Sequence, residues 1–158
     1  MLSQQEADKL RAMPKRLVQP ESMAVPPAGD SLVYELESMD TRHKFLMDAN
    51  RRGKIVLNRC TYQERYRIVE LLARLDIGGP PHRNPRVGKA PLDYLEEYNG
   101  AQVRCPHLHV YVEGYEDKWA VPASSGDFPL TDDLTQTLRD FMRYCGVVEI
   151  PDIQSELI

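Results

Sequence analysis

Hydrophobic residues recur along the chain with two different periods, which separate predicted strands from predicted helices. From Ser31 onward, apolar side chains occupy every second position in two successive runs, residues 31–37 and 45–49. The alternating positions are Leu32, Tyr34, Leu36, Phe45, Met47 and Ala49. A period of two is typical of strands with one buried face, so both runs are predicted strands. A turn at 51–53 and a third strand over 54–59 would complete an antiparallel meander.

A first helix is predicted before these strands. Ser3 and Glu6 have the spacing of a capping box, which predicts a helix that runs to about Met13. Pro14 either ends this helix or lets it restart as a short piece over 15–18, because proline cannot donate a backbone hydrogen bond.

A second helix is predicted after the strands. Its apolar residues follow helical spacing at Leu134, Leu138, Phe141, Met142 and Cys145. Thr131 is the predicted first cap and Gly146 the predicted end, which gives a helix over 131–145.

The segment 62–77 fits either a helix or a long strand by periodicity alone. Its content of aromatic and β-branched residues favours one strand. On that strand Val69, Leu71, Ala73 and Leu75 would face the core together, and Arg74 and Asp76 would share the opposite face.

A proline-rich stretch over 78–104 follows, and we interpret it as a long irregular loop of the kind that often carries function. The next segment, 106–114, alternates strictly. One face would carry Leu108, Val110 and Val112, and the other His107, His109 and Tyr111. A short strand over 119–121 is predicted to pair back with it.

Together these elements predict an α+β fold in a single domain spanning residues 1–158. We expect an antiparallel, meander-like sheet with the N-terminal helix and the helix over 131–145 packed on one face. The other face would carry a polar cluster of histidine, arginine and aspartate. A composition with 42% hydrophobic and 28% charged residues supports a globular chain.

The composition also limits where the protein is expected to be located in the cell and which kinds of partner it is expected to bind. No apolar run reaches the roughly 20 residues that span a bilayer, and the first residues are polar, so we expect a cytoplasmic protein with no membrane partner. The three cysteines lie far apart and are interpreted as reduced thiols. A net charge of −4 argues against coating nucleic acid through bulk electrostatics. A local basic segment, HRNPRVGK, remains a candidate contact surface.

The candidate catalytic residues are Arg74, Asp76, His82, His107 and His109. In a metal-independent cleavage of a phosphodiester, one imidazole takes a proton from the ribose 2′-hydroxyl and a second protonates the leaving oxygen. Arg74 would stabilise the charge on the phosphorus centre, and Asp76 would orient a histidine. Histidine suits this work because its pKa lies close to neutral pH. The candidate substrate-binding residues are Arg83, Asn84, Arg86, Lys89 and Tyr111.

Two other interpretations of the cluster stay open. His107 and His109 on one side of a strand could bind a metal, with His82 or Asp76 as a third ligand. The same side chains could instead hold a loop to the sheet and perform no chemistry. Our expectation from the sequence is a site without metal or cofactor.

Several segments resemble a family of small bacterial proteins of uncharacterised function, often encoded on phages and other mobile elements. They are LSQQEADKL, PPAGDSLVYEL, HRNP, CPHLHVYVEGYEDKWAVPA and FMRYCGVVEIP. The central pattern of that family is similar to PHxNPDG followed by a strand HxHxYxE. The matching residues are His82, Asn84, Pro85, His107, His109, Tyr111 and Glu113. Arg86 and Val87 stand where the pattern has Asp-Gly.

A second resemblance covers only the middle of the chain. The order RLD, PPH and PHLH is similar to the R-x-D, P-H and P-H-x-H layout of toxins from bacterial toxin–antitoxin pairs. This resemblance implies a ribonuclease-type toxin that acts on RNA and is held inactive by a protein partner, with His82 and either His107 or His109 as acid and base. The alternative is a protein without catalytic activity that binds and inhibits a host defence protein, as anti-CRISPR proteins do.

Overall fold

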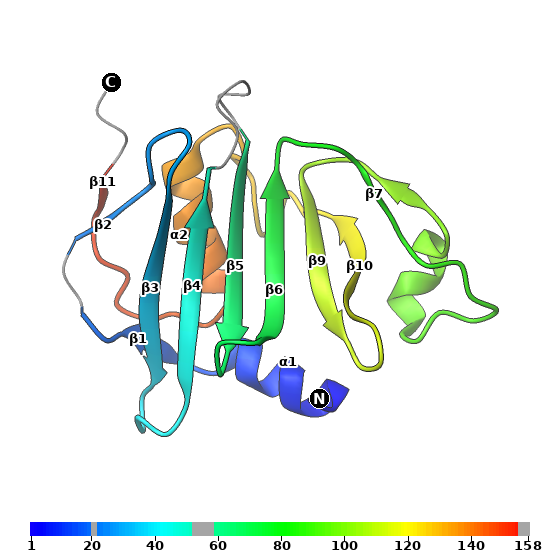
Figure 1. The fold of residues 1–158 in the computed structure, drawn as a ribbon, viewed down its shortest axis with the longest axis horizontal. Helices are drawn as coiled ribbons and strands as arrows, with labels where there is room; N and C mark the ends of the chain where they lie inside the picture. Colours follow the sequence, from blue (N-terminus) through cyan, green and yellow to red (C-terminus); the bar gives the residue numbers. More distant parts are fainter. Residues whose placement is uncertain (20–21, 52–58, 155–158) are drawn as a thin grey trace.

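The sheet has seven strands, and every neighbouring pair runs antiparallel. The computed structural model describes residues 1–19, 22–51 and 59–154. In sheet order the strands are β1 (Lys15–Leu17), β3 (Ser31–Ser38), β4 (Lys44–Asn50), β5 (Cys60–Tyr66), β6 (Glu70–Ile77), β9 (His107–Val112) and β10 (Glu116–Pro122). Spatial order thus follows chain order, as Figure 1 shows, and the predicted α+β fold with a meander-like sheet is confirmed.

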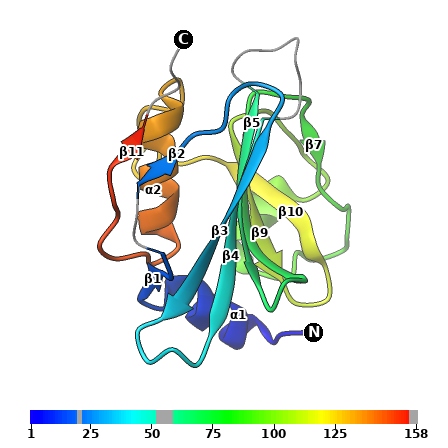
Figure 2. The same cartoon turned by 60° about the vertical axis from the view of Figure 1, so that its left-hand side comes forward.

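Two helices share one hydrophobic core with the sheet. They are α1 (Gln4–Ala12) and α2 (Leu134–Tyr144), and Figure 2 shows α2 against one side of the strands. Leu10 of α1 and Phe141 of α2 belong to the same buried cluster as Leu75 of β6. A small parallel pair, β2 (Met23–Ala24) with β11 (Ile153–Gln154), lies on the outer side of α2 (Figure 2).

The helix ends differ slightly from the predicted ones. The capping box of α1 is present, since Ser3 and Glu6 each bond to the backbone of the other. In α2 the cap is Asp133 and not Thr131, because the Asp133 carboxylate accepts the free backbone N–H of Gln136. The predicted helix over 131–145 therefore begins three residues late, at Leu134.

The prediction of one strand over 62–77 is wrong, because this segment forms a hairpin. Its two halves, β5 and β6, pair with each other and turn through Arg67 and Ile68, whose φ angles are 50° and 72°. Ile68 and Val69 are 66% and 79% exposed. These β-branched residues imitate a strand interior in the sequence, yet they lie in the turn. Arg74 and Asp76 still lie on the same face of the sheet, as predicted, because that prediction depends only on the alternation within β6.

Two smaller predictions also change. Residues 15–17 form strand β1, paired with β3, and not a restarted helix. The far edge of β1 is paired too, since Lys15 exchanges backbone bonds with Gly146 and Val148. The strand predicted over 54–59 falls mostly on residues 52–58, which lie outside the described part of the chain.

The segment 78–104 is folded and not structureless as predicted. It contains β7 (His82–Arg83), paired with β8 (Gln102–Val103), and the 3-10 helix η1 (Asp93–Tyr98). A second buried cluster attaches it to the sheet, formed by Ala90, Leu95, Val112 and Trp119.

Asn84 closes the outer edge of β10. Its side-chain amide donates to the carbonyl of Ala120 and accepts from the Ala120 N–H, both at 2.8 Å. Asn84 thus satisfies both backbone groups of Ala120 as a neighbouring strand would.

Lys15 joins the helix layer to the sheet from a fully buried position. Its ammonium donates to the carbonyls of Leu10 and Arg11, 2.7 and 3.1 Å away, at the end of α1. It also pairs with the buried Glu64 of β5. Burial raises the pKa of Glu64, and the charge of Lys15 opposes that rise.

Among the described residues, we find no helix with the length and apolarity needed to cross a membrane.

Replacing Lys15 should destabilise the protein strongly. Lys15→Met leaves Glu64 buried without its counter-charge, which typically costs about 3–5 kcal/mol. We expect the double variant Lys15→Met/Glu64→Gln to recover part of this loss. Urea denaturation followed by circular dichroism measures both. Lys9→Met, on the exposed side of α1, is the matched control. Wild-type stability in Lys15→Met, or no recovery in the double variant, would contradict this account.

Candidate functional site

The pairing of β6 with β9 brings the predicted catalytic residues together. In this register Arg74 lies opposite His109, and Asp76 lies opposite His107. His82 reaches the same place from β7, with its ring centroid 4.6 Å from that of His109 and 6.1 Å from that of His107. All five residues form one cluster, which we call the histidine cluster.

Asp76 is the centre of the histidine cluster. Its Oδ2 atom lies 3.0 Å from Nε2 of His107 and 3.1 Å from Nε2 of His109. Its Oδ1 atom accepts a hydrogen bond from Thr61 at 3.0 Å and lies 3.3 Å from Nε of Arg74. Burial alone would raise the pKa of Asp76, but the bonds from His107 and His109 and the charge of Arg74 hold it well below its usual value. Asp76 is therefore an ionised carboxylate at neutral pH.

The second nitrogen of each buried imidazole is fixed by a backbone carbonyl. Nδ1 of His107 donates to Val103 at 3.1 Å, and Nδ1 of His109 donates to Asp117 at 2.8 Å. Both Nε2 atoms consequently face Asp76. Nε2 of His109 also lies 2.9 Å from a guanidinium nitrogen of Arg74, so the Asp76 carboxylate and the guanidinium compete for this nitrogen.

His82 is the more accessible imidazole. Its Nε2 atom donates to the carbonyl of Lys118 at 2.8 Å, so Nδ1 is the ring nitrogen without a proton in the neutral form. Burial lowers the pKa of His82, and the neighbouring His109, His107 and Arg74 act in the same direction.

Access to the cluster differs sharply between its members. The side chains of His107 and His109 are only 2% and 1% exposed, whereas those of Asp76 and Arg74 are 21% and 27% exposed. An open hollow of about 300 Å³ borders Asp76 and Arg74. Its other lining residues are Asn50, Arg59, Thr61, Gln63, Gly78, Gly79, Pro80 and Cys105. A ligand in this hollow meets the guanidinium and the carboxylate, while His107 and His109 act on it only through Asp76.

The predicted substrate-binding residues lie elsewhere. The side chain of Asn84 is hydrogen-bonded to the backbone of Ala120 at the edge of β10, and the hydroxyl of Tyr111 donates to the carbonyl of Leu2. Arg83 bonds to Gly100 and Gln102. Arg86 packs over Gly100, and Lys89 is exposed. In the described part of the chain, no hydrogen bond or ion pair links these five residues to the histidine cluster.

The sequence did not single out Asp117, which supports the cluster from β10. Its carboxylate accepts from Arg74 at 3.1 Å, and its carbonyl fixes His109. The predicted hairpin partner strand over 119–121 began too late to include it. Cys105 is a further neighbour, with its sulfur 3.6 Å from Nδ1 of His107. Burial and the charge of Asp76 raise the pKa of Cys105, which keeps it a thiol.

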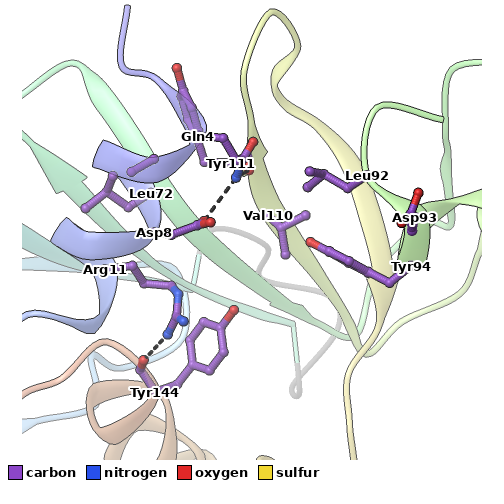
Figure 3. Close-up of a pocket in the computed structure, with 11 residues that line it drawn as sticks. Gln4, Asp8, Arg11, Leu72, Leu92, Asp93, Tyr94, Val110, Tyr111 and Tyr144 are labelled. Atoms are coloured by element: carbon purple, nitrogen blue, oxygen red, sulfur yellow. Dashed lines mark hydrogen bonds between the residues drawn. The ribbon is translucent and has the colours of Figure 1, made fainter.

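A larger hollow of about 570 Å³ lies among α1, η1 and β9 and is separate from the cluster (Figure 3). Arg11 and Tyr144 form one wall, where the guanidinium lies 4.2 Å from the ring centroid. Tyr94 and Val110 line it from the opposite side (Figure 3). The sequence did not predict this hollow, because its walls come from five segments that lie far apart in the chain: α1, β6, residues 92–94, β9 and α2.

The fold and the site thus define an α+β protein in which two buried histidines meet a partly exposed aspartate beside an open polar hollow. A family model described as "Family of unknown function (DUF6978)" matches residues 2–147, and the chain belongs to this family. No curated protein and no solved structure matches the chain significantly.

Removing the amide of Asn84 should destabilise the protein without any ligand present. Asn84→Ala leaves a buried N–H and C=O of Ala120 unpaired, which costs about 1–3 kcal/mol. Asn84→Asp places a buried carboxylate against the carbonyls of Ala120 and Tyr98, so we expect a loss at least as large as that of Asn84→Ala. Thermal unfolding measures the series, with the exposed neighbour Arg83→Ala as control. Equal stability of Asn84→Ala and Arg83→Ala would show that the edge contact is unimportant.

Proposed function

We propose that this protein cleaves phosphodiester bonds in RNA, as the toxin of a toxin–antitoxin or mobile-element system. The observation that carries the proposal is the meeting of Arg74 and Asp76 at the wall of an open hollow, with the ring of His82 4.6 Å from that of His109, which contacts both of them. A cation, an ionised carboxylate and an accessible imidazole are the groups that bind a phosphate and move a proton.

The roles follow from exposure. Arg74 holds the phosphate and stabilises the charge that develops on it. His82, with Nδ1 unprotonated in its neutral form, takes the proton from the ribose 2′-hydroxyl and then gives it to the leaving oxygen. His107 and His109 are positioning residues, because their nitrogens are bonded inside the protein and they orient Asp76 and Arg74.

The substrate and the partner are inferred from the toxin-like order of Arg74, Asp76, His82, His107 and His109 in the sequence. Such toxins generally act on RNA and are held inactive by a partner protein. We therefore propose a cytoplasmic location, a protein partner and RNA as substrate.

A growth assay joined to RNA cleavage tests this function. Expression of the wild type should arrest growth, and the purified protein should cleave RNA but not RNA with 2′-deoxy substitutions. Arg74→Ala and His82→Ala should relieve the arrest and lower the cleavage rate by about 10²-fold or more. His43→Ala is the matched histidine control, since His43 bonds to Tyr66 and lies outside the cluster. Harmless expression and intact RNA with the wild type would refute the proposal.

The second candidate is an inhibitor that binds a host defence protein, as an anti-CRISPR protein does. One observation favours it: all four ring nitrogens of His107 and His109 are bonded within the protein, as in a purely structural cluster. In that case expression is harmless, and phage plating recovers on a host with active immunity. Arg74→Ala and His82→Ala would then leave the inhibition unchanged.

A further inference from the structure

We propose that Asp76, His107 and His109 bind a divalent transition-metal ion of the zinc type. The ligand atoms would be Oδ2 of the carboxylate and Nε2 of each imidazole. Binding is independent of the proposed function; only the use of the metal in RNA cleavage rests on that function. This inference departs from the metal-free site that the sequence favoured.

The spacing of the three atoms is the first argument. Oδ2 lies 3.0 and 3.1 Å from the two Nε2 atoms, and all three atoms lie within 4.8 Å of one another. Zinc bonds of about 2.0–2.2 Å in a tetrahedron place neighbouring donors about 3.3–3.6 Å apart. The donor set therefore already has nearly the size of a metal site.

The fixed orientation of the imidazoles is the second argument. A metal-binding histidine almost always donates its other ring N–H to a carbonyl or a carboxylate, which aims the free nitrogen at the metal. His107 does this through Val103, and His109 through Asp117. Both rings come from one strand with alternating side chains, so they point to the same side.

The charge at the centre is the third argument. His107 has a hydrogen-bond acceptor at each nitrogen, a carbonyl on one side and the Asp76 carboxylate on the other. A metal ion between Nε2 and the carboxylate would bond to both and balance the charge of Asp76.

Arg74 is the competing cation. Its guanidinium lies 2.9 Å from Nε2 of His109, but its Nε atom is buried and makes no well-directed hydrogen bond in the described structure. Asp117 offers the guanidinium a second partner at 3.1 Å. Arg74 can therefore keep this partner while a metal takes the place beside His109.

The ligand types identify the class of metal. Two imidazoles and one carboxylate favour zinc and neighbouring transition metals over magnesium and calcium, which prefer oxygen. Three protein ligands leave a position for water or a phosphate oxygen, as in catalytic zinc sites. The hollow of about 300 Å³ beside Asp76 gives access to that position. There the metal would polarise a phosphate oxygen or activate a water molecule.

Metal titration of chelator-treated full-length protein tests the site. We expect one Zn²⁺ per chain by calorimetry, and a visible absorption band when Co²⁺ is added. Asp76→Asn, His107→Gln and His109→Gln should each weaken Zn²⁺ binding by about 100-fold or more. His43→Gln should bind as the wild type does. Arg74→Ala should bind more tightly, because a competing cation is removed, and this gain is not expected of a structural cluster.

Folding and function are separated by further measurements. Zn²⁺ should raise the thermal unfolding temperature of the wild type and of Arg74→Ala, but not that of folded Asp76→Asn. No stoichiometric binding by the wild type, or equal binding by the ligand variants, overturns the site. RNA cleavage that persists unchanged after chelation refutes the use of the metal and leaves the proposed function standing. One bound Zn²⁺ per chain without any RNA cleavage confirms the metal site and refutes the proposed function.

Discussion

The register between β6 and β9 is the constraint on which the site depends. It places Arg74 opposite His109 and Asp76 opposite His107, although a long folded excursion separates the two strands in the chain. A slip of one residue would turn both imidazoles into the hydrophobic core. The register is held from the other face, where Leu75 and Leu108 face each other under the helices. The packing of the core thus sets the geometry of the polar cluster.

The local pattern of the sequence predicts much of the fold but only part of the site. A period of two in residues 70–77 and 107–112 is enough to assign the faces of Asp76 and His109. The hairpin turn at Arg67 and Ile68 escaped prediction because β-branched residues there imitate a strand. Asp117 and the clamp of Asn84 escaped because both depend on contacts between segments distant in sequence. Burial of the imidazoles likewise comes from tertiary packing, which no local pattern shows.

The histidine cluster also shows why residue type alone left three interpretations open. Acid–base catalysis, metal binding and structural bonding can all use a carboxylate near imidazoles. They differ in which nitrogen faces which partner. In this structure Nδ1 of each buried ring is tied to the backbone, and Nε2 faces Asp76. That arrangement leaves His107 and His109 no free nitrogen with which to exchange a proton with a substrate. It favours a cation bound between the two Nε2 atoms and the Asp76 carboxylate.

The clamp of Asn84 on β10 limits how a partner protein can dock. Many proteins recognise an extended peptide by adding it as one more strand, which needs a row of unpaired backbone groups. Here Asn84 occupies the backbone of Ala120 at one border of the sheet, and residues 146–148 occupy that of Lys15 at the other. A partner would find little free backbone at these points. At these borders a partner would recognise side chains on a face of the molecule, so the specificity of the complex would rest on surface charge and shape.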